Sequence, residues 1–453
     1  MPVLQVDPGL AAGNTAWVLA AAALVMFMTP GLGFFYAGFT RSKNVLGTIM
    51  QSFIVVGLVG VQWVVIGYTL AFGPDQAGII GGLDYFGLKD VGLNTVDPYT
   101  STTGVPHEAF MIFQAMFAII TPALITGAFA ERAKFSTFLV FMLAWSLFVY
   151  DPVAHWVFGT GWLGVLNTNG VNALDFAGGT AIHVNAGAAA LAAALLFGRR
   201  RGFGKEPMEP HNVTYIVLGA AILWFGWFGF NAGSAGAASG QAANAFVVTN
   251  TAAAAAALSW MFASWALTGK ASVIGAAAGA VAGLVAITPA SGFVQPMEAI
   301  AIGGVAGVIC YLAVRLRERT SLDDSLDVVA VHGVGGTWGA LATGLFAAAA
   351  IGGFDGLEHG HGSQVVDQLV AIGVVWVYSF TVTAIILKVL DVTMGLRVSE
   401  DEEEMGLDVT QHGERGYVFD EGAVAPLPQY LEAPATPAPA TRPRPEPMAS
   451  SEA

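Results

Sequence analysis

Two histidines in apolar segments are the residues of this chain best suited to chemistry. His183 and His332 each follow an aspartate by eight positions, Asp175 in the first case and Asp324 in the second. Imidazole titrates near neutral pH and can both donate and accept a hydrogen bond. Ionisable groups are costly within a membrane and are functional candidates there by default. The pair predicts a pore or a proton-handling site; the alternative for each histidine alone is a buried polar group satisfied by a neighbour.

The equal spacing predicts equal depth for the two imidazoles. Eight helical residues rise about 12 Å, which reaches close to the middle of an apolar core about 30 Å thick. We expect the helix of His183 to run inward and that of His332 to run outward. The same pattern in opposite directions indicates an inverted repeat, whose substrate path lies at the interface of its halves. Asp175 is expected to cap its helix and, as an anion near the outer mouth, to favour the access of cations.

The composition places these histidines in a membrane protein. Hydrophobic residues make up 55% of the 453 residues and charged residues 11%, and the mean hydropathy is +0.64. A soluble domain carries about 25% charged residues. The net charge of −14 offers no general basic surface for nucleic acid. The single cysteine, Cys310, excludes an internal disulfide and a cysteine-built metal site, and we expect neither a metal nor another cofactor.

Apolar stretches long enough to cross a lipid bilayer, about 20 residues each, suggest eleven transmembrane helices. They lie at 16–38, 46–72, 109–129, 135–150, 176–197, 213–234, 244–268, 272–289, 296–314, 326–350 and 366–390. The fourth is short, and the aromatic segment after it, 151–166, is expected to be a partly buried surface loop. The prediction is an all-α polytopic membrane protein, in which five helices are repeated in inverted orientation and an eleventh is added.

Basic residues, which collect in cytoplasmic loops, set the orientation. With the N-terminus outside, the outer loops contain only Lys89. The inner loops then contain twelve basic residues, namely Arg41, Lys43, Arg132, Lys134, Arg199, Arg200, Arg201, Lys205, Lys270, Arg315, Arg317 and Arg319. Eleven spans are needed to keep this asymmetry in phase, so we predict an outer N-terminus and an inner C-terminus.

The chain is predicted to have three parts. Residues 1–391 form the membrane domain, and residues 392–422, with an acidic cluster at 400–404, form a cytoplasmic C-terminal segment. Residues 423–453 are rich in Pro and Ala and are expected to be a disordered tail.

Several motifs resemble the ammonium transporter family (Amt/Mep/Rh), in particular its bacterial Amt-type members. They are DFAGG-x3-H at 175–183, VHGVGG at 331–336, ILWFGWFGFNAGSAG at 222–236, PGLGFFYAGFTRSKN at 30–44, TGAFAER at 126–132, GFGKEPMEPHN at 202–212 and GLRV…GLDVTQHGE at 395–414. The resemblance covers about residues 10–418. It implies a homotrimer in the inner (plasma) membrane, with eleven helices and a narrow pore in each protomer.

The resemblance also implies an outer site that recruits ammonium at Phe117, Ser234 and an aromatic residue at position 158. Aromatic faces attract the cation by about 2 kcal/mol when it is desolvated, and a serine oxygen can accept one of its N–H groups. The family usually has Trp where this chain has Phe158. Since Phe is a weaker cation–π partner, this departure bears on the affinity of the outer site.

Below the outer site, the resemblance implies a stacked aromatic gate of Phe117 and Phe230. Three further aromatic residues are expected to line the pore near this gate, namely Phe113, Phe35 and Trp227. His183 and His332 then line an apolar pore that sodium and potassium cannot enter without a costly loss of water. Ammonium can instead release its proton and pass as ammonia, and we expect the imidazoles to relay the proton so that net charge moves.

The family also implies a protein partner, and two alternative functions remain within it. In bacterial members a PII signalling protein docks on the inner face, and the loop 199–205 and the segment 392–418 are the expected contacts. Alternatives are an ammonium sensor with little flux and an Rh-like neutral gas channel. A metal-dependent enzyme built on the two histidines is disfavoured, because no HExxH pattern occurs. His359 and His361 lie in a predicted outer loop that is expected to be solvated.

Overall fold

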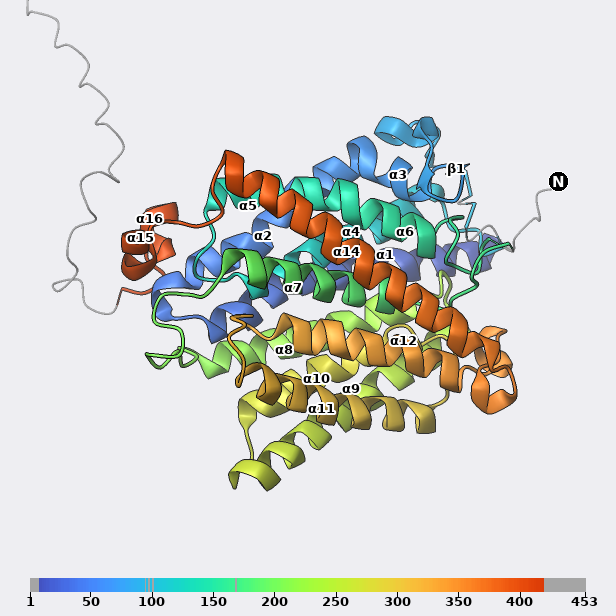
Figure 1. Ribbon diagram of the computed structural model, residues 1–453. Helices are drawn as coiled ribbons and strands as arrows, with labels where there is room; N and C mark the ends of the chain where they lie inside the picture. The colour runs from blue at the N-terminus through green and yellow to red at the C-terminus, as the bar shows by residue number, and fades with distance from the viewer. Residues whose placement is uncertain (1–7, 94, 97, 100–101, 168, 419–453) are drawn as a thin grey trace, which may run out of the picture.

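A computed structural model describes residues 8–418 except 94, 97, 100–101 and 168, and it is a bundle of long helices (Figure 1). The predicted tail at 423–453 lies outside the described residues. The C-terminal helices α15 (Glu400–Met405) and α16 (Leu407–His412) lie at one end of the bundle, and the small strands lie at the other. The inner and outer faces that the sequence predicts therefore correspond to opposite ends of the bundle.

The elements are α-helices, two short strands and short η segments, of which η2, η5, η6 and η7 are π turns. In the first half they are α1 (Pro8–Phe39), η1 (Ser42–Asn44), α2 (Val45–Gln62), η2 (Trp63–Gly67), α3 (Tyr68–Phe72), β1 (Asp75–Gln76), β2 (Ile80–Gly81), η3 (Leu83–Leu88), α4 (His107–Ile125), η4 (Thr126–Ala128), α5 (Phe135–Trp145), η5 (Ser146–Tyr150), α6 (Asp151–Val157), η6 (Gly179–Val184) and α7 (Asn185–Phe197). In the second half they are α8 (Val213–Gly233), α9 (Gly240–Thr268), α10 (Val273–Ile287), α11 (Pro296–Arg317), η7 (Val329–Val334), α12 (Gly335–Phe346), α13 (Ala349–Gly352), η8 (Leu357–His359) and α14 (Ser363–Thr393), followed by α15 and α16. The two strands pair antiparallel.

The prediction of an all-α membrane protein that crosses the bilayer several times is confirmed. Among the described residues, nine helices are long and apolar enough to span a membrane. They are Gly9–Phe39, Ser42–Phe72, His107–Ala128, Phe135–Val157, Gly179–Phe197, Val213–Gly233, Gly240–Thr268, Pro296–Arg317 and Ser363–Thr393. The remaining predicted spans coincide with shorter helices, α10 for 272–289 and the continuous η7–α12 for 326–350.

The predicted end of the fourth span at residue 150 is wrong. The helix continues through η5 and α6 to Val157, and residues 151–157 are buried. Pro152 lacks an amide hydrogen and normally interrupts a helix, but here it follows a π turn that already shifts the regular hydrogen bonding. In the interior, Asp151 accepts a hydrogen bond of 3.1 Å at Oδ2 from the Gln62 amide, and its Oδ1 has no partner among the described residues.

Glycines bring the two histidine-bearing helices into backbone contact. A Cβ atom on Gly187 would lie 2.3 Å from the Cα of Gly333, and one on Gly336 would lie 2.9 Å from the Cβ of His183. Small residues allow such close approach between membrane helices. In Figure 1, α7 and α12 both lie in the middle of the bundle, and each follows one of the π turns η6 and η7.

A buried ionic network joins the loops at the end of the bundle that carries α15 and α16. Glu131 Oε2 lies 3.1 Å from the guanidinium groups of both Arg41 and Arg200, and Arg200 also binds Asp323 at 2.8 Å. Burial alone would raise the pKa of Glu131, but Arg200 and Arg41 outweigh it and lower that pKa to about 2. Glu131 is therefore ionised, and it connects the loops that follow α1, η4 and α7.

The C-terminal segment docks on this network. Lys43 donates through Nζ to the main-chain carbonyls of Glu403 and Glu404, and the amide of Leu407 donates to Asn44 Oδ1 at 2.8 Å. The side chain of Glu403 is 1% exposed and binds Arg397 at 2.6 Å. Part of the predicted acidic cluster is thus buried against the membrane domain.

Candidate functional site

The two aspartates that precede the histidines both cap π turns. Asp175 accepts hydrogen bonds from the amides of Gly178, Gly179, Thr180 and Ala181 at 2.6–3.1 Å, and from the Thr180 hydroxyl at 2.5 Å. Asp324 accepts one of 2.7 Å from the amide of Val329. Since the first amides of a helix lack partners within it, these carboxylates fix where η6 and η7 begin.

The two histidines, which are predicted to lie at equal depth, are in contact in the interior of the molecule. Nδ1 of His332 lies 3.2 Å from Nδ1 of His183, and the ring centroids are 5.2 Å apart at 27°. The residues are 3% and 1% exposed. One imidazole nitrogen of the contact must donate and the other accept, so a single proton lies between the rings.

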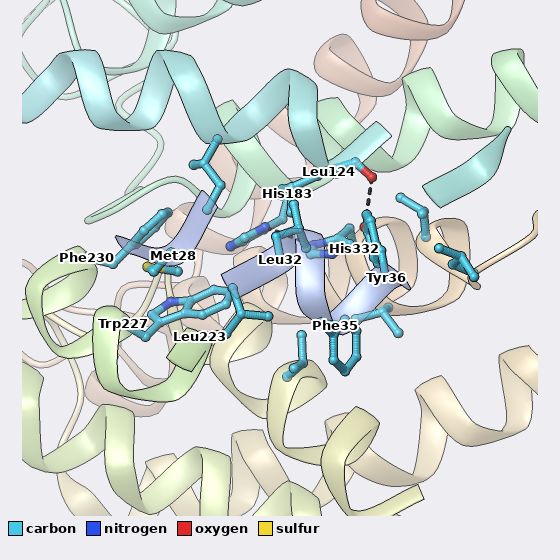
Figure 2. Close-up of a pocket in the computed structure, with 15 residues that line it drawn as sticks. Met28, Leu32, Phe35, Tyr36, Leu124, His183, Leu223, Trp227, Phe230 and His332 are labelled. Carbon is cyan, nitrogen blue, oxygen red and sulfur yellow. Dashed lines mark hydrogen bonds between the residues drawn. The ribbon is translucent and has the colours of Figure 1, made fainter. Parts of the chain in front are cut away.

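A narrow cavity of about 20 Å³ runs along the histidine pair (Figure 2). The side chains that line it are largely apolar or aromatic: Met28, Leu32, Phe35, Tyr36, Ile120, Leu124, Leu223, Trp227, Phe230, Val281, Leu326, Val328 and Val331, with His183 and His332. The indole of Trp227 is stacked on His183 with centroids 5.4 Å apart, and its Nε1 donates to Thr288 Oγ1 at 2.8 Å. Thr288 therefore fixes the position of the indole.

Figure 2 separates the predicted pore aromatics into two groups. Trp227 and Phe230 lie at one end of the cavity, and Phe35 lies at the other, beside Tyr36. Phe35 thus lines the cavity on the side of the histidines opposite to Phe230. The family resemblance implied instead that Phe35 lies near the gate. The Tyr36 hydroxyl donates to the Leu124 carbonyl at 2.8 Å.

Phe117 and Phe230 are in contact, with centroids 4.5 Å apart, but the rings are tilted by 59° instead of stacked in parallel. Phe113 meets Phe117 edge-to-face at 4.8 Å and 76°, and it lies against Gly233. Tilted and edge-to-face contacts suit the quadrupole of aromatic rings. The predicted gate is therefore a closed contact between α4 and α8, with Phe113 supporting it.

An outer cavity of about 240 Å³ brings together the four predicted recruitment residues, Phe117, Phe158, Asp175 and Ser234. The Ser234 hydroxyl donates to the Phe230 carbonyl at 2.8 Å, which leaves its oxygen able to accept. Because Phe117 lines this cavity and Phe230 lines the central one, their contact divides the two.

The sequence reasoning missed several residues of the outer cavity, among them Tyr99, Phe110, Gln114, Phe176 and Phe293. Tyr99 and Phe110 are stacked with centroids 5.6 Å apart at 15°, and the Tyr99 hydroxyl donates to the Phe72 carbonyl at 2.8 Å. Gln114 could have been predicted as a lining residue, because it lies three residues before Phe117 on α4 and so shares its helix face. Tyr99 reaches the cavity from a loop, and no local pattern marks it.

An inner cavity of about 350 Å³ continues the series. It shares Phe35, Leu326 and Val331 with the central cavity, and Asp327 and Arg315 are among its other lining residues. In the part of the chain that the structure describes, no group of three or more His, Cys, Asp or Glu side chains could hold a metal ion. The site thus comprises three neighbouring cavities: the central one contains the histidine pair, shares lining residues with the inner one, and is separated from the outer one by the contact of Phe117 and Phe230.

Comparisons with known proteins identify the family in which this arrangement occurs. The model of the Ammonium Transporter Family matches residues 16–417. An ammonium transporter of Bacillus subtilis (strain 168) is 48% identical over 408 residues, which cover 89% of this chain and 98% of that one. The crystal structure of Candida albicans Mep2 matches with a TM-score of 0.80 at 39% identity, over 91% of this chain and 90% of that one.

A further solved structure, described as a sensor Amt protein, has a TM-score of 0.80 at 29% identity and covers 89% of this chain and 99% of that one. The family and the curated relatives are transporters and not enzymes, which removes the alternative of an intramembrane metalloenzyme. The chain belongs to the ammonium transporter family.

Proposed function

We propose that this protein recruits ammonium in the outer cavity, removes its proton and conducts ammonia past the histidine pair, with net transfer of the proton. The observation that carries the proposal is the pair His183 and His332 in a narrow apolar cavity that has a further cavity on either side of it in the set of lining residues. Membership of the family supports ammonium as the substrate.

Recruitment rests on the chemistry of the outer cavity. The faces of Phe117 and Phe158 attract a cation, and the Ser234 oxygen accepts one of its N–H groups. Asp175 adds negative charge, but its oxygens are occupied by main-chain donors, so it attracts ammonium without binding it directly.

Selectivity rests on the central cavity. A volume of about 20 Å³ admits about one molecule of the size of water or ammonia. Sodium or potassium would have to leave its hydration shell for apolar walls, which is costly. Ammonia carries no charge, and it can hydrogen-bond to the imidazoles as it passes.

Proton handling rests on the histidine contact. Nε2 of His183 has no hydrogen-bond partner among the described side chains and backbone, so it is available to the substrate. A proton received there can be passed through the Nδ1–Nδ1 contact of 3.2 Å to His332. Ammonia and its proton would then reach the inner side by the same pair, which makes the transport electrogenic.

The proposal also covers the topology of the protein, its oligomeric state and its regulatory partner. Eleven membrane helices, as an inverted repeat of five plus one with the N-terminus outside, keep the basic loops on the inner face. Each protomer of a homotrimer in the plasma membrane holds its own pore. The docked segment that contains α15 and α16, with the loop 199–205, forms the inner face on which a PII-type protein would bind.

The test is an ammonium pulse on proteoliposomes with simultaneous measurement of current and of internal alkalinisation or uptake. We expect a current that saturates with ammonium, and its loss in His183→Ala. Ammonia flux without current would instead indicate a neutral gas channel. Binding of ammonium without flux would indicate a sensor, the function that the described sensor Amt protein with the same fold brings into consideration.

A further inference from the structure

The aspartate that precedes His332 caps η7 with only one of its two oxygens. We propose that Asp324 is the group on the inner side of the pore that accepts the transported proton. This inference rests on the proposed electrogenic function and adds the site at which the proton leaves the histidine pair.

Asp175 and Asp324 occupy equivalent positions but are satisfied very differently. The Asp175 carboxylate receives five hydrogen bonds on its two oxygens. Asp324 is 0% exposed, its Oδ2 accepts from Val329 at 2.7 Å, and its Oδ1 has no hydrogen-bond partner among the described residues. Donors stabilise the ionised form of a carboxyl group, whereas burial without donors favours the protonated form. Of the two caps, only Asp324 has an oxygen on which a proton can be placed without displacing a donor.

The location of Asp324 suits this role. The turn that it begins lines both inner parts of the path, since Val328 borders the central cavity, Asp327 borders the inner cavity and Leu326 borders both. Asp324 also interacts electrostatically with Tyr36, which lines the central cavity beside His332 (Figure 2). Asp324 is not itself a lining residue of either cavity; it lies at the start of the turn that lines the path between the histidines and the inner face.

Burial, together with the surrounding charges, places the pKa of Asp324 near neutral pH. Burial raises its pKa to about 7, and Asp327 adds to the rise. The amide of Val329 and the guanidinium of Arg317 oppose it. Arg317 is itself bound to Asp327 at 2.8 Å. The neighbouring Asp323 is held in ion pairs with Arg200 at 2.8 Å and Arg132 at 4.0 Å, so it is not an alternative acceptor.

The step is a simple proton transfer. An N–H bond of the imidazolium breaks, the proton is relayed by hydrogen-bonded water over the rise of eight helical residues, about 12 Å, and an O–H bond forms at Oδ1, with each relaying water left unchanged. The Asp324 carboxylate becomes a neutral carboxylic acid and neutral imidazole is restored. The proton then passes to water on the inner side. No other bond changes, and no oxidant or reductant takes part.

The experiment measures the ammonium-driven current in oriented proteoliposomes while the pH on the inner side is varied. In the wild-type protein the current should fall about tenfold from about pH 8 to about pH 6, as the ionised fraction of a group with a pKa of about 7 does. Asp324→Asn keeps an oxygen to cap Val329 but cannot accept the proton, so the current should be low and independent of inner pH.

Asp327→Asn is the matched variant, because it removes the neighbouring negative charge and leaves Asp324 in place. Residue 327 has φ +58°, which asparagine tolerates. The midpoint of the pH profile should move to lower pH. An Asp324→Asn protein with the wild-type profile would overturn the proposal. If that variant fails to insert, an unshifted midpoint in Asp327→Asn would overturn it equally.

The outcomes also separate this proposal from the function on which it rests. Wild-type uptake without current would refute the electrogenic function and this inference together. Wild-type current whose dependence on inner pH survives in Asp324→Asn would refute this inference alone.

Discussion

Replacing Glu131 with Gln should destabilise the protein by about 3 kcal/mol, the free energy of a pKa displaced from 4.5 to about 2. The Glu131 side chain is fully buried and faces Arg41 and Arg200, each at 3.1 Å. Glutamine keeps the shape but leaves Arg41 without its charge partner and Arg200 with Asp323 alone. Removing one partner of a buried ion pair typically costs about 3–5 kcal/mol, in agreement with this figure.

The assay is thermal or denaturant unfolding of purified protein in detergent, followed by tryptophan fluorescence. Glu404→Gln is the control, because Glu404 forms its ion pair with Arg201 at the surface, where the two side chains are 64% and 44% exposed. Such a pair contributes about 0–1 kcal/mol. If Glu131→Gln were no more destabilising than Glu404→Gln, the ionic network would not stabilise the inner face and the reasoning would fail.

Acidification gives an independent check. The pKa of Glu131 is lower in the folded protein than in the unfolded chain, so its contribution is complete above about pH 4.5 and is lost as the pH falls towards 2. The stability difference between wild type and Glu131→Gln should therefore shrink over that interval. A difference that stays constant down to pH 2 would mean that the carboxylate charge is not what stabilises the wild type.

Three substitutions test the path itself. Gly187→Ala places a Cβ 2.3 Å from the Cα of Gly333. This overpacking costs about 1–3 kcal/mol and should abolish ammonium uptake at normal membrane insertion. Full uptake would contradict the close helix contact. Phe158→Trp should lower the half-saturating ammonium concentration about fivefold, for a gain of about 1 kcal/mol in cation–π attraction, and an unchanged value would show that residue 158 does not face the cation. Thr288→Val removes the acceptor of the Trp227 indole and should reduce the current, whereas Thr288→Ser should retain it; equal currents would exclude a positioning role.

The parts of the site that could be predicted are those that depend on position along one helix. The spacing from Asp175 to His183 and from Asp324 to His332 determines depth, because helical rise per residue is constant. Two equal depths on oppositely directed helices predict that the imidazoles meet, and their nitrogens lie 3.2 Å apart. The caps follow from the same local pattern.

Features that depend on contacts between distant segments could not be predicted. The fourth helix continues past Asp151 because Gln62, on another helix, hydrogen-bonds to its carboxylate. Tyr99 reaches the outer cavity because its hydroxyl is held by the carbonyl of Phe72. Phe35 lies on the far side of the histidines because α1 crosses the central cavity along its length, with Met28, Leu32 and Phe35 all lining it. None of these contacts leaves a periodic trace in the sequence.

The proposed inverted repeat poses a physical question, because a symmetric pore would have no preferred side on which to hold a proton. The chain departs from symmetry at the two caps. Five donors satisfy Asp175, whereas one oxygen of Asp324 is left without a partner among the described residues. Both oxygens of the Asp175 cap are thereby occupied by donors, whereas the Asp324 cap has an oxygen on which a proton can be placed. Under the two proposals, the direction of proton transfer arises from unequal hydrogen bonding at equivalent positions of the two halves. The two sides of the pore then need no different set of residues.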